Sequence, residues 1–250
     1  MRYLLSVFVL MLLSFGLSAQ PDNWYFSITM GGCFPAGTFA NTNPAVGGTG
    51  FATKGFALNL DATYPVSNHW GLKGMVVLNN NPIDRNGIGT MMEDRMKKLV
   101  PFTEAERDNL SLSVNSWMSN SLIFGPVYSL NFDNVSLDFQ ALTGMHVSYL
   151  PNQKLLYKNS SGTWEYLQHN TNSTNVSMDF LAGMALRFKV TDKVQLKVAI
   201  NYQRAGSTTK YEEVKSTKIG STITNNVLNS GHAFVTNEVV TPTIGFVYYL

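Results

Sequence analysis

Two segments with alternating polar and apolar residues carry the residue types used in acyl-transfer chemistry. His146 and Ser148 share one side of the first segment, and Ser177 and Asp179 share one side of the second. A histidine oriented by a carboxylate can act as a general base toward a serine nucleophile. The sequence therefore offers His146 and Asp179 as a candidate base and its orienting group, with Ser148 or Ser177 as the candidate nucleophile.

The same two segments carry a second pair of complementary groups. If they pair as antiparallel strands with Leu150 opposite Asn175, residues whose numbers have the same sum face each other. That register brings together two pairs, His146 with Asp179 and Asp138 with Arg187. Charges that face a narrow interior must be paired where water is scarce. Because no nucleophile motif is visible, we favour a structural network over an active site.

The other three histidines give no signal for a metal site. His69 lies in a short connection, and His169 and His232 lie in long polar stretches. Their spacing matches no local metal-ligand motif. We therefore predict that they are solvated, and the sequence indicates no catalytic, cofactor-binding or metal-binding residue.

Eight alternating segments position these groups. Each has apolar residues on one side and small or polar residues on the other, which is the pattern of a half-buried β-strand. The predicted strands are 24–31, 54–64, 70–78, 117–130, 135–149, 177–188, 194–203 and 241–250. Segment 70–78 is the weakest, because it does not define an apolar face. Pro126 and Pro242 lie inside strands, where each removes a hydrogen bond and is expected to mark a bulge or a strand end.

Short and long connections alternate along the chain. The short ones lie around Ser67, Asp133 and Asp192, and the long polar ones span 32–53, 79–116, 151–175 and 205–235. Long connections without structure are uncommon in a compact soluble domain, whereas outer-membrane barrels have short periplasmic turns and long extracellular loops. The pattern predicts an all-β fold, an eight-stranded antiparallel up-and-down transmembrane barrel over residues 20–250 with four long extracellular loops.

The alternation also predicts which side chains meet the lipid. The mid-membrane band comprises Leu137, Phe139, Phe180, Met184, Leu196, Val198, Ile244 and Phe246. The aromatic girdles at the two interfaces comprise Tyr64, Trp70, Trp117, Tyr128, Tyr149, Tyr202 and Tyr248. The opposite sides face a narrow lumen, which side chains fill in a barrel of this size.

The N-terminal residues have the composition of a secretory signal peptide. Arg2 precedes an apolar run, and Leu17-Ser18-Ala19 resembles a cleavage site, so residues 1–19 are predicted to be removed. The single cysteine, Cys33, excludes a disulfide within the chain. A formal net charge of +2 gives no electrostatic case for nucleic acid.

The layout resembles that of the small outer-membrane β-barrel proteins of Gram-negative bacteria, the porin-like or opacity-type group. Residues 32–40 and 50–56 are similar to the first extracellular loop and second strand of many such barrels. The resemblance implies a location in the outer membrane and contact with its lipids. It implies no particular task, because this fold serves adhesins, structural proteins, lipid enzymes and pores.

The second long connection contains a predicted helix from Thr90 to Leu99. Thr90 is placed to cap it, with Glu93 as the capping-box partner. Met92, Met96 and Leu99 would share one face. Such a face can bind a partner adaptably or fold onto the barrel rim, and we favour the second role. The other long connections are expected to be mobile, because Asn, Ser, Thr and Gly dominate them.

The sequence thus favours a non-enzymatic, monomeric outer-membrane protein with a filled lumen. Its role would be structural, or an interaction with an extracellular ligand through the long loops, and the sequence does not identify that ligand. Two alternatives remain open, a narrow passive pore and a lipid-modifying enzyme built on His146. No cofactor is implied.

Overall fold

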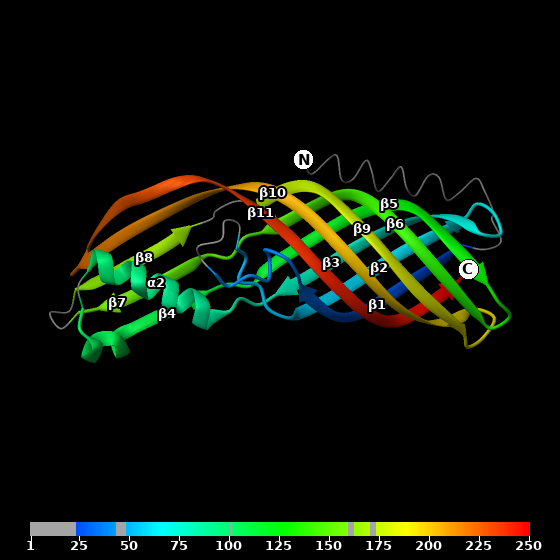
Figure 1. Ribbon diagram of the computed structural model, residues 1–250, viewed down its shortest axis with the longest axis horizontal. Coiled ribbons are helices and arrows are strands. Elements are labelled where there is room, and N and C mark those ends of the chain that lie inside the picture. Colours follow the sequence, from blue (N-terminus) through cyan, green and yellow to red (C-terminus); the bar gives the residue numbers. More distant parts are fainter. Residues whose placement is uncertain (1–23, 44–48, 101, 160–162, 171–173) are drawn as a thin grey trace.

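Eight antiparallel strands form a closed ring (Figure 1). The computed structural model describes residues 24–43, 49–100, 102–159, 163–170 and 174–250, so the predicted signal peptide lies outside the described residues. The ring consists of β1 (Tyr25–Pro35), β2 (Gly55–Pro65), β3 (Trp70–Asn81), β5 (Trp117–Asn131), β6 (Val135–Tyr149), β9 (Thr174–Lys189), β10 (Val194–Ile219) and β11 (Thr222–Tyr249). Pairing of β11 with both β10 and β1 closes it. The predicted transmembrane barrel is confirmed.

The outer and inner sides of the ring differ as the alternation predicts. Phe124, Phe180 and Phe246 are 64%, 61% and 58% exposed on the outside, where a bilayer supplies the apolar surroundings that water cannot. Polar residues at the alternate positions, such as Asn59 and Thr241, are buried inside. The three short connections all lie at one end of the barrel, and the long ones at the other (Figure 1).

Strand β3 is apolar on both sides because one wall of the lumen is apolar. Its inward residues Met75 and Val77 pack with inward residues of three neighbouring strands, Ile123, Leu142 and Leu181. The outward positions, including Leu72 and Val76, are exposed to lipid. The sequence of β3 therefore shows no single apolar face because its central residues are apolar on both sides. Strand β3 is nevertheless a regular strand of the ring.

The two strand prolines interrupt pairing on one side only. Pairing of β5 with β6 stops after Phe124 and resumes at Val127 in the same register, on either side of Pro126. Pairing of β1 with β11 likewise stops at Gly31 and resumes at Phe34, opposite Pro242. The expected bulges or strand ends at these prolines are wrong, because each strand continues straight through the gap.

The long connections form a sheet outside the membrane, which corrects the expectation of mobile loops. Strands β10 and β11 continue far beyond the barrel, and β8 (Trp164–Asn170), β7 (Gln153–Lys158) and β4 (Leu110–Val114) add to β10 in that order. We call β11, β10, β8, β7 and β4 beyond the barrel the extracellular sheet. Its strands gave no clear pattern in the sequence because polar residues lie on much of both faces.

One helix covers one side of this sheet. Helix α2 (Arg85–Leu99) begins after Asp84, whose side chain accepts a hydrogen bond from the Asn86 amide, so the predicted start at Thr90 is wrong. The predicted face is correct, because Met92 and Met96 are buried. The short 3₁₀ helix η1 (Glu104–Asn109) follows. Within the described residues, neither helix is both long and apolar enough to span a bilayer.

Candidate functional site

Near the short turns, the lumen is closed by an ion pair between β6 and β9, which we call the lower pair. Nε and Nη2 of Arg187 donate to the two carboxylate oxygens of Asp138 at 2.7 and 2.8 Å. Arg187 also donates to the Tyr249 hydroxyl, and its guanidinium lies 4.7 Å from the ring centre of Tyr25. Both charged residues are buried. Such a bidentate contact fixes geometry as well as charge.

The predicted partners meet, but the predicted register is wrong by two residues. In the β6–β9 ladder, Asp138 lies opposite Ala185, and Ser136 lies opposite Arg187. The ion pair is therefore diagonal. Positions two residues apart on neighbouring strands remain within reach of long side chains, so the contact survives the shift.

A second group of charges, the central network, fills the middle of the lumen. Lys197 lies 2.7 Å from one carboxylate oxygen of Asp61, and Lys73 lies 3.7 Å from the other. Lys73 also donates to Gln140 at 2.7 Å, and Gln140 donates to Asn201 at 2.7 Å. These side chains come from β2, β3, β6 and β10, so the network ties opposite walls together. All five are buried.

The candidate catalytic residues belong to the third group, the upper network. Nδ1 of His146 lies 2.9 Å from the Ser121 hydroxyl and 3.6 Å from Asp179. Gln203 bridges the other two, donating to Ser121 at 2.9 Å and to Asp179 at 2.5 Å. The remaining ring nitrogen, Nε2, lies 3.4 Å from the amide nitrogen of Asn237. All of these side chains are buried.

This geometry differs from that of a serine–histidine–acid triad. In a triad the base binds the nucleophile through one ring nitrogen and the acid through the other. Here Ser121 and Asp179 both approach Nδ1 of His146. The predicted contact of His146 with Asp179 exists, although Ser177 lies opposite His146 in the ladder.

Neither predicted nucleophile bonds to the histidine. The Ser177 hydroxyl has no hydrogen-bond partner among the described residues, and Ser148 lies opposite Ser119 and Asn175. The sequence did not identify Ser121 as a partner of His146, because nothing in its strand distinguishes it from the neighbouring serines. Only the pairing of β5 with β6 could have indicated that Ser121 lies near His146.

The other histidines lie apart from the upper network. His69 contacts the Ser129 carbonyl at 3.1 Å in the β2–β3 turn, and His232 is exposed on β11. The side chain of His169 lies outside the described residues. Among the residues that the structure describes, no group of three or more His, Cys, Asp or Glu side chains could hold a metal ion.

An apolar plug seals the lumen at the extracellular end. We call it the mouth cluster; its fully buried members include Cys33, Phe39, Ile88, Met96 and Val239, and Phe51, Ile83, Met92 and Trp117 are nearly so. The indole of Trp117 lies edge-on to Phe39 at 5.3 Å and donates to the Gly50 carbonyl at 2.8 Å. Trp117 therefore points inward, and its predicted place in the aromatic girdle is wrong.

In the described ranges of the chain, three ion pairs involve α2, and one of them joins the helix to the extracellular sheet. Arg95 contacts Glu213 of β10 at 2.5 Å, and Glu93 lies 3.0 Å from both Lys97 and Arg107. Burial raises the pKa of Glu93, but the hydrogen bonds and charges of these two partners outweigh it and bring the pKa below its usual value.

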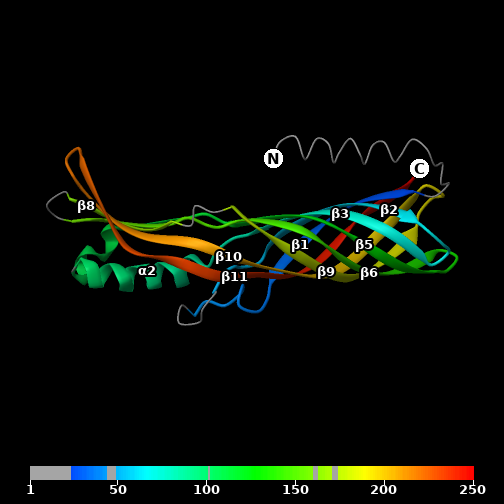
Figure 2. The same cartoon turned by 90° about the horizontal axis from the view of Figure 1, so that it is seen from above.

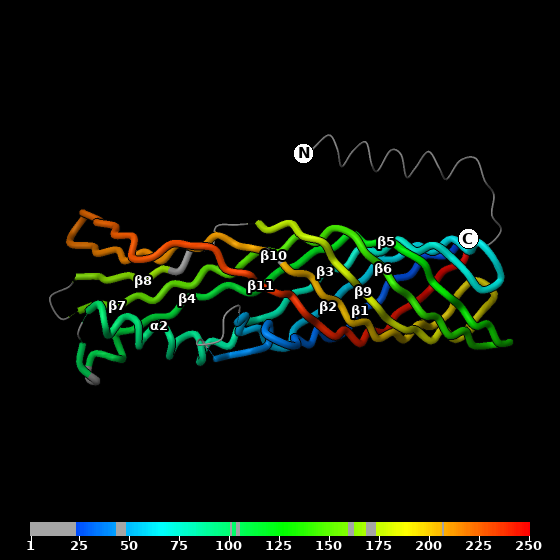
Figure 3. Tube along the Cα trace, turned by 45° about the horizontal axis from the view of Figure 1, so that its top comes forward, coloured from blue at the N-terminus to red at the C-terminus, as the bar shows by residue number. Residues whose placement is uncertain are grey.

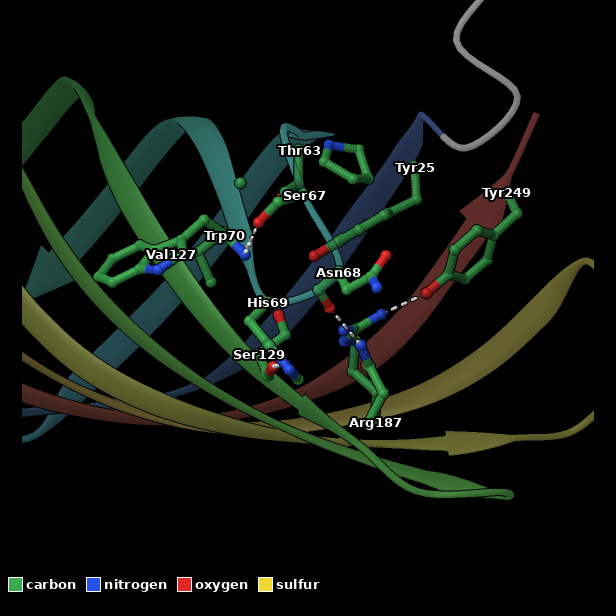
Figure 4. Close-up of a pocket in the computed structure, with 13 residues that line it drawn as sticks. Tyr25, Thr63, Ser67, Asn68, His69, Trp70, Val127, Ser129, Arg187 and Tyr249 are labelled. Carbon is green, nitrogen blue, oxygen red and sulfur yellow. Dashed lines mark hydrogen bonds between the residues drawn. The ribbon is translucent and has the colours of Figure 1, made fainter.

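The opposite end of the lumen is open. A cavity of about 470 Å³ lies among the short turns, lined by Tyr25, Asn68, His69, Arg187 and Tyr249 among others (Figure 4). Its inner wall includes Arg187 of the lower pair, whose guanidinium donates to Asp138, Gln195 and Tyr249. From this end to the outside, the lumen therefore passes through three side-chain networks and one apolar plug in series.

No protein-family model matches the chain, and no curated protein matches it significantly. Among solved structures it is similar to the outer membrane protein OprG of Pseudomonas aeruginosa, with 9% identity and a TM-score of 0.47 over 92% of this chain and 97% of that one. It is also similar to Neisserial surface protein A, with 10% identity and a TM-score of 0.45 over 91% and 97%.

The outer membrane protease OmpT of Escherichia coli is a third similar structure, with 9% identity and a TM-score of 0.41 over 94% of this chain and 99% of that one. At these identities the likeness concerns the fold alone. The eight-stranded ring and its apolar exterior carry the fold assignment by themselves: this chain folds as a membrane-spanning β-barrel of the outer-membrane type.

Proposed function

We propose that the protein is a non-conducting, non-enzymatic outer-membrane barrel that serves to hold an ordered interaction surface outside the cell. The observation that supports this most is the series of closures in the lumen. The lower pair, the central network, the upper network and the mouth cluster all consist of buried side chains. Water and ions find no open path where each layer is filled and its charges are paired.

The extracellular sheet supports the second half of the proposal. Its strands are hydrogen-bonded continuously to the barrel through β10 and β11. A ligand that binds such a surface does not have to order it first, so less of the binding free energy is lost. We therefore propose that the extracellular interaction predicted for the long loops takes place on a face of this sheet or on α2.

Planar-bilayer recording of the refolded protein tests the closed lumen. The wild type should give no discrete conductance steps. A central-network variant (Asp61→Ala, Lys73→Ala and Lys197→Ala) and a mouth variant (Phe39→Ala and Trp117→Ala) should each stay silent, because the other closures remain. Their combination should stay silent as well, because the lower pair and the upper network still close the lumen. Regular steps from the wild type would instead support the passive pore.

The enzyme alternative has its own test. A lipid-modifying enzyme would use the upper network, but both candidate groups share one nitrogen of His146, and that side chain is 2% exposed inside the barrel. Wild-type protein in vesicles should not turn over phospholipid or lipid A. Turnover that disappears in His146→Ala but not in Thr243→Ala, a buried lumen position outside the upper network, would overturn the proposal.

A further inference from the structure

The extracellular sheet has one covered face and one open face. Helix α2 contacts β4 and β7 from one side of the sheet, and in the part of the chain that the structure describes no helix or strand lies along the other side (Figure 2). Leu155, Tyr157 and Leu167 point toward the helix and are buried. The residues that alternate with them point to the open face, which is continuous with the lipid-facing outside of the barrel because β10 runs through both.

Strand registers define the open face as three rows across β7, β8, β10 and β11, which we call the outer grid. The row at the tip is Lys158, Trp164, Lys218 and Ile223. The next row is Leu156, Tyr166, Ser216 and Asn225. The row nearest the barrel is Lys154, Gln168, Val214 and Val227.

The outer grid is positively charged, because it contains three lysines and no carboxylate. Two carboxylates of the same strands, Glu165 and Glu213, lie on the covered face near Lys215 and Arg95. A third, Glu212, is exposed on the open face one row closer to the barrel than the grid. In the described part of the chain, the three ammonium groups of the grid have no carboxylate at ion-pair distance. The outer grid itself therefore carries a net positive charge.

The lysines are arranged around aromatic rings. Lys154 lies 4.3 Å from the ring centre of Tyr166, and Lys158 lies 5.0 Å from that of Trp164. These contacts hold flexible side chains near the surface of the sheet. Gln168, Ser216 and Asn225 add neutral donors and acceptors between the charges.

We propose that the outer grid binds an acidic polysaccharide, a chain that carries regularly spaced carboxylate or sulfate groups. The ammonium groups of the lysines can form ion pairs with the carboxylate or sulfate groups, because they are point charges on flexible side chains. Amide and hydroxyl groups match its hydroxyls, and the flat apolar parts of Trp164 and Tyr166 can pack on sugar rings. The proposal rests on the proposed surface function and names its ligand class.

The distance of the grid from the membrane indicates whether its ligand is a lipid headgroup or a polysaccharide outside the membrane. The exposed apolar run of β10, which includes Val198 and Ile200, ends at Tyr202, so we place the lipid boundary there. Val214 in the innermost row is 12 positions further out. Twelve residues of strand span roughly 40 Å, or about 28 Å outward at a 45° tilt. The polar headgroup layer is only about 5–8 Å thick. The grid therefore lies beyond the headgroup phosphates and faces polysaccharide presented from outside the membrane.

Binding of heparin and of alginate to the full-length protein in zwitterionic vesicles tests the proposal. Lys154→Gln, Lys158→Gln and Lys218→Gln together should weaken binding by about tenfold or more, because three ion pairs are lost. A control with the same net charge, Lys54→Gln, Lys98→Gln and Lys193→Gln, should change it less than twofold. Trp164→Ala keeps every charge and should still weaken binding several-fold.

Three results would overturn the proposal. They are equal loss in the two triple variants, unchanged binding in the grid variant, and tighter binding of single-stranded DNA than of either polysaccharide. Circular dichroism of each variant checks that the sheet is folded. Bilayer conductance reads the lumen alone, so a failure of the polysaccharide proposal leaves the closed-barrel function standing, and the reverse also holds.

Discussion

At the scale of single residues, the lower pair stabilises the barrel through two charges that need each other. Asp138→Asn or Arg187→Gln leaves the partner buried and unpaired, so each should destabilise the protein by about 3–5 kcal/mol. The double variant should cost less than the sum of the two. Urea unfolding in lipid vesicles measures this cycle, and strict additivity would contradict the observed contact.

Outward side chains should respond to charge according to their depth. Val198 lies in the mid-membrane band, where arginine should cost about 2–4 kcal/mol of folding free energy. Val190, exposed beside the short β9–β10 turn, is the matched control and should lose about 0–1 kcal/mol. Equal losses in refolding titrations would show that the lipid boundary is misplaced.

A polar inward position is not a mild control for this experiment. Asn201 is buried and accepts a hydrogen bond from Gln140 at 2.7 Å. A β-carbon added at Gly183 would lie 2.1 Å from its side-chain oxygen. Arginine at position 201 would have no space, so polarity alone does not make the lumen tolerant.

At the scale of elements, helix α2 depends on ionised Glu93. Its folded pKa is below the unfolded value, so the stability it contributes is fully present above about pH 4.3 and is lost as the pH falls through the folded pKa. Glu93→Gln should therefore loosen α2 at pH 7, and its difference from the wild type should shrink as the pH falls toward 3. Hydrogen exchange of the α2 amides, compared between variants at each pH, measures this difference.

The exposed neighbour supplies the control for that prediction. Asp94 is on the same helix and is exposed. Asp94→Asn should leave α2 exchange close to that of the wild type at both pH values. If Glu93→Gln shows the same difference at pH 3 as at pH 7, the ion pairs with Lys97 and Arg107 do not hold the helix.

At the scale of the whole molecule, the mouth cluster isolates the single cysteine. Cys33 is fully buried, and its thiol donates to Asn81 at 3.2 Å. A small maleimide should label the folded wild type slowly. Trp117→Ala opens the cluster and should speed labelling at least tenfold, whereas Trp70→Ala at the opposite end should not. Rapid labelling of the folded wild type would contradict the seal.

The sequence by itself determined the number of barrel strands, their faces and the three short turns. This information is local, because the side of a strand repeats every two residues and each side meets one environment, lipid or lumen. Residue type is a weaker guide than this alternation. Trp117 was placed in the girdle because it is aromatic and ends its strand, whereas the alternation of β5 puts it inward with Ser119 and Ser121, in the mouth cluster.

Tertiary structure alone decided the register and the extracellular sheet. Alternation fixes parity, but a shift of two residues leaves every face unchanged, so Asp138 and Arg187 could be paired correctly in the wrong register. Each barrel strand faces lipid on one side, whereas the sheet beyond the membrane faces lipid on neither side. Its strands therefore lack the apolar alternation of the barrel. Its strands form because β10 and β11 extend the hydrogen-bonding ladder and α2 covers one face. These contacts join segments that are distant in the sequence, so the sequence of one segment alone does not predict them.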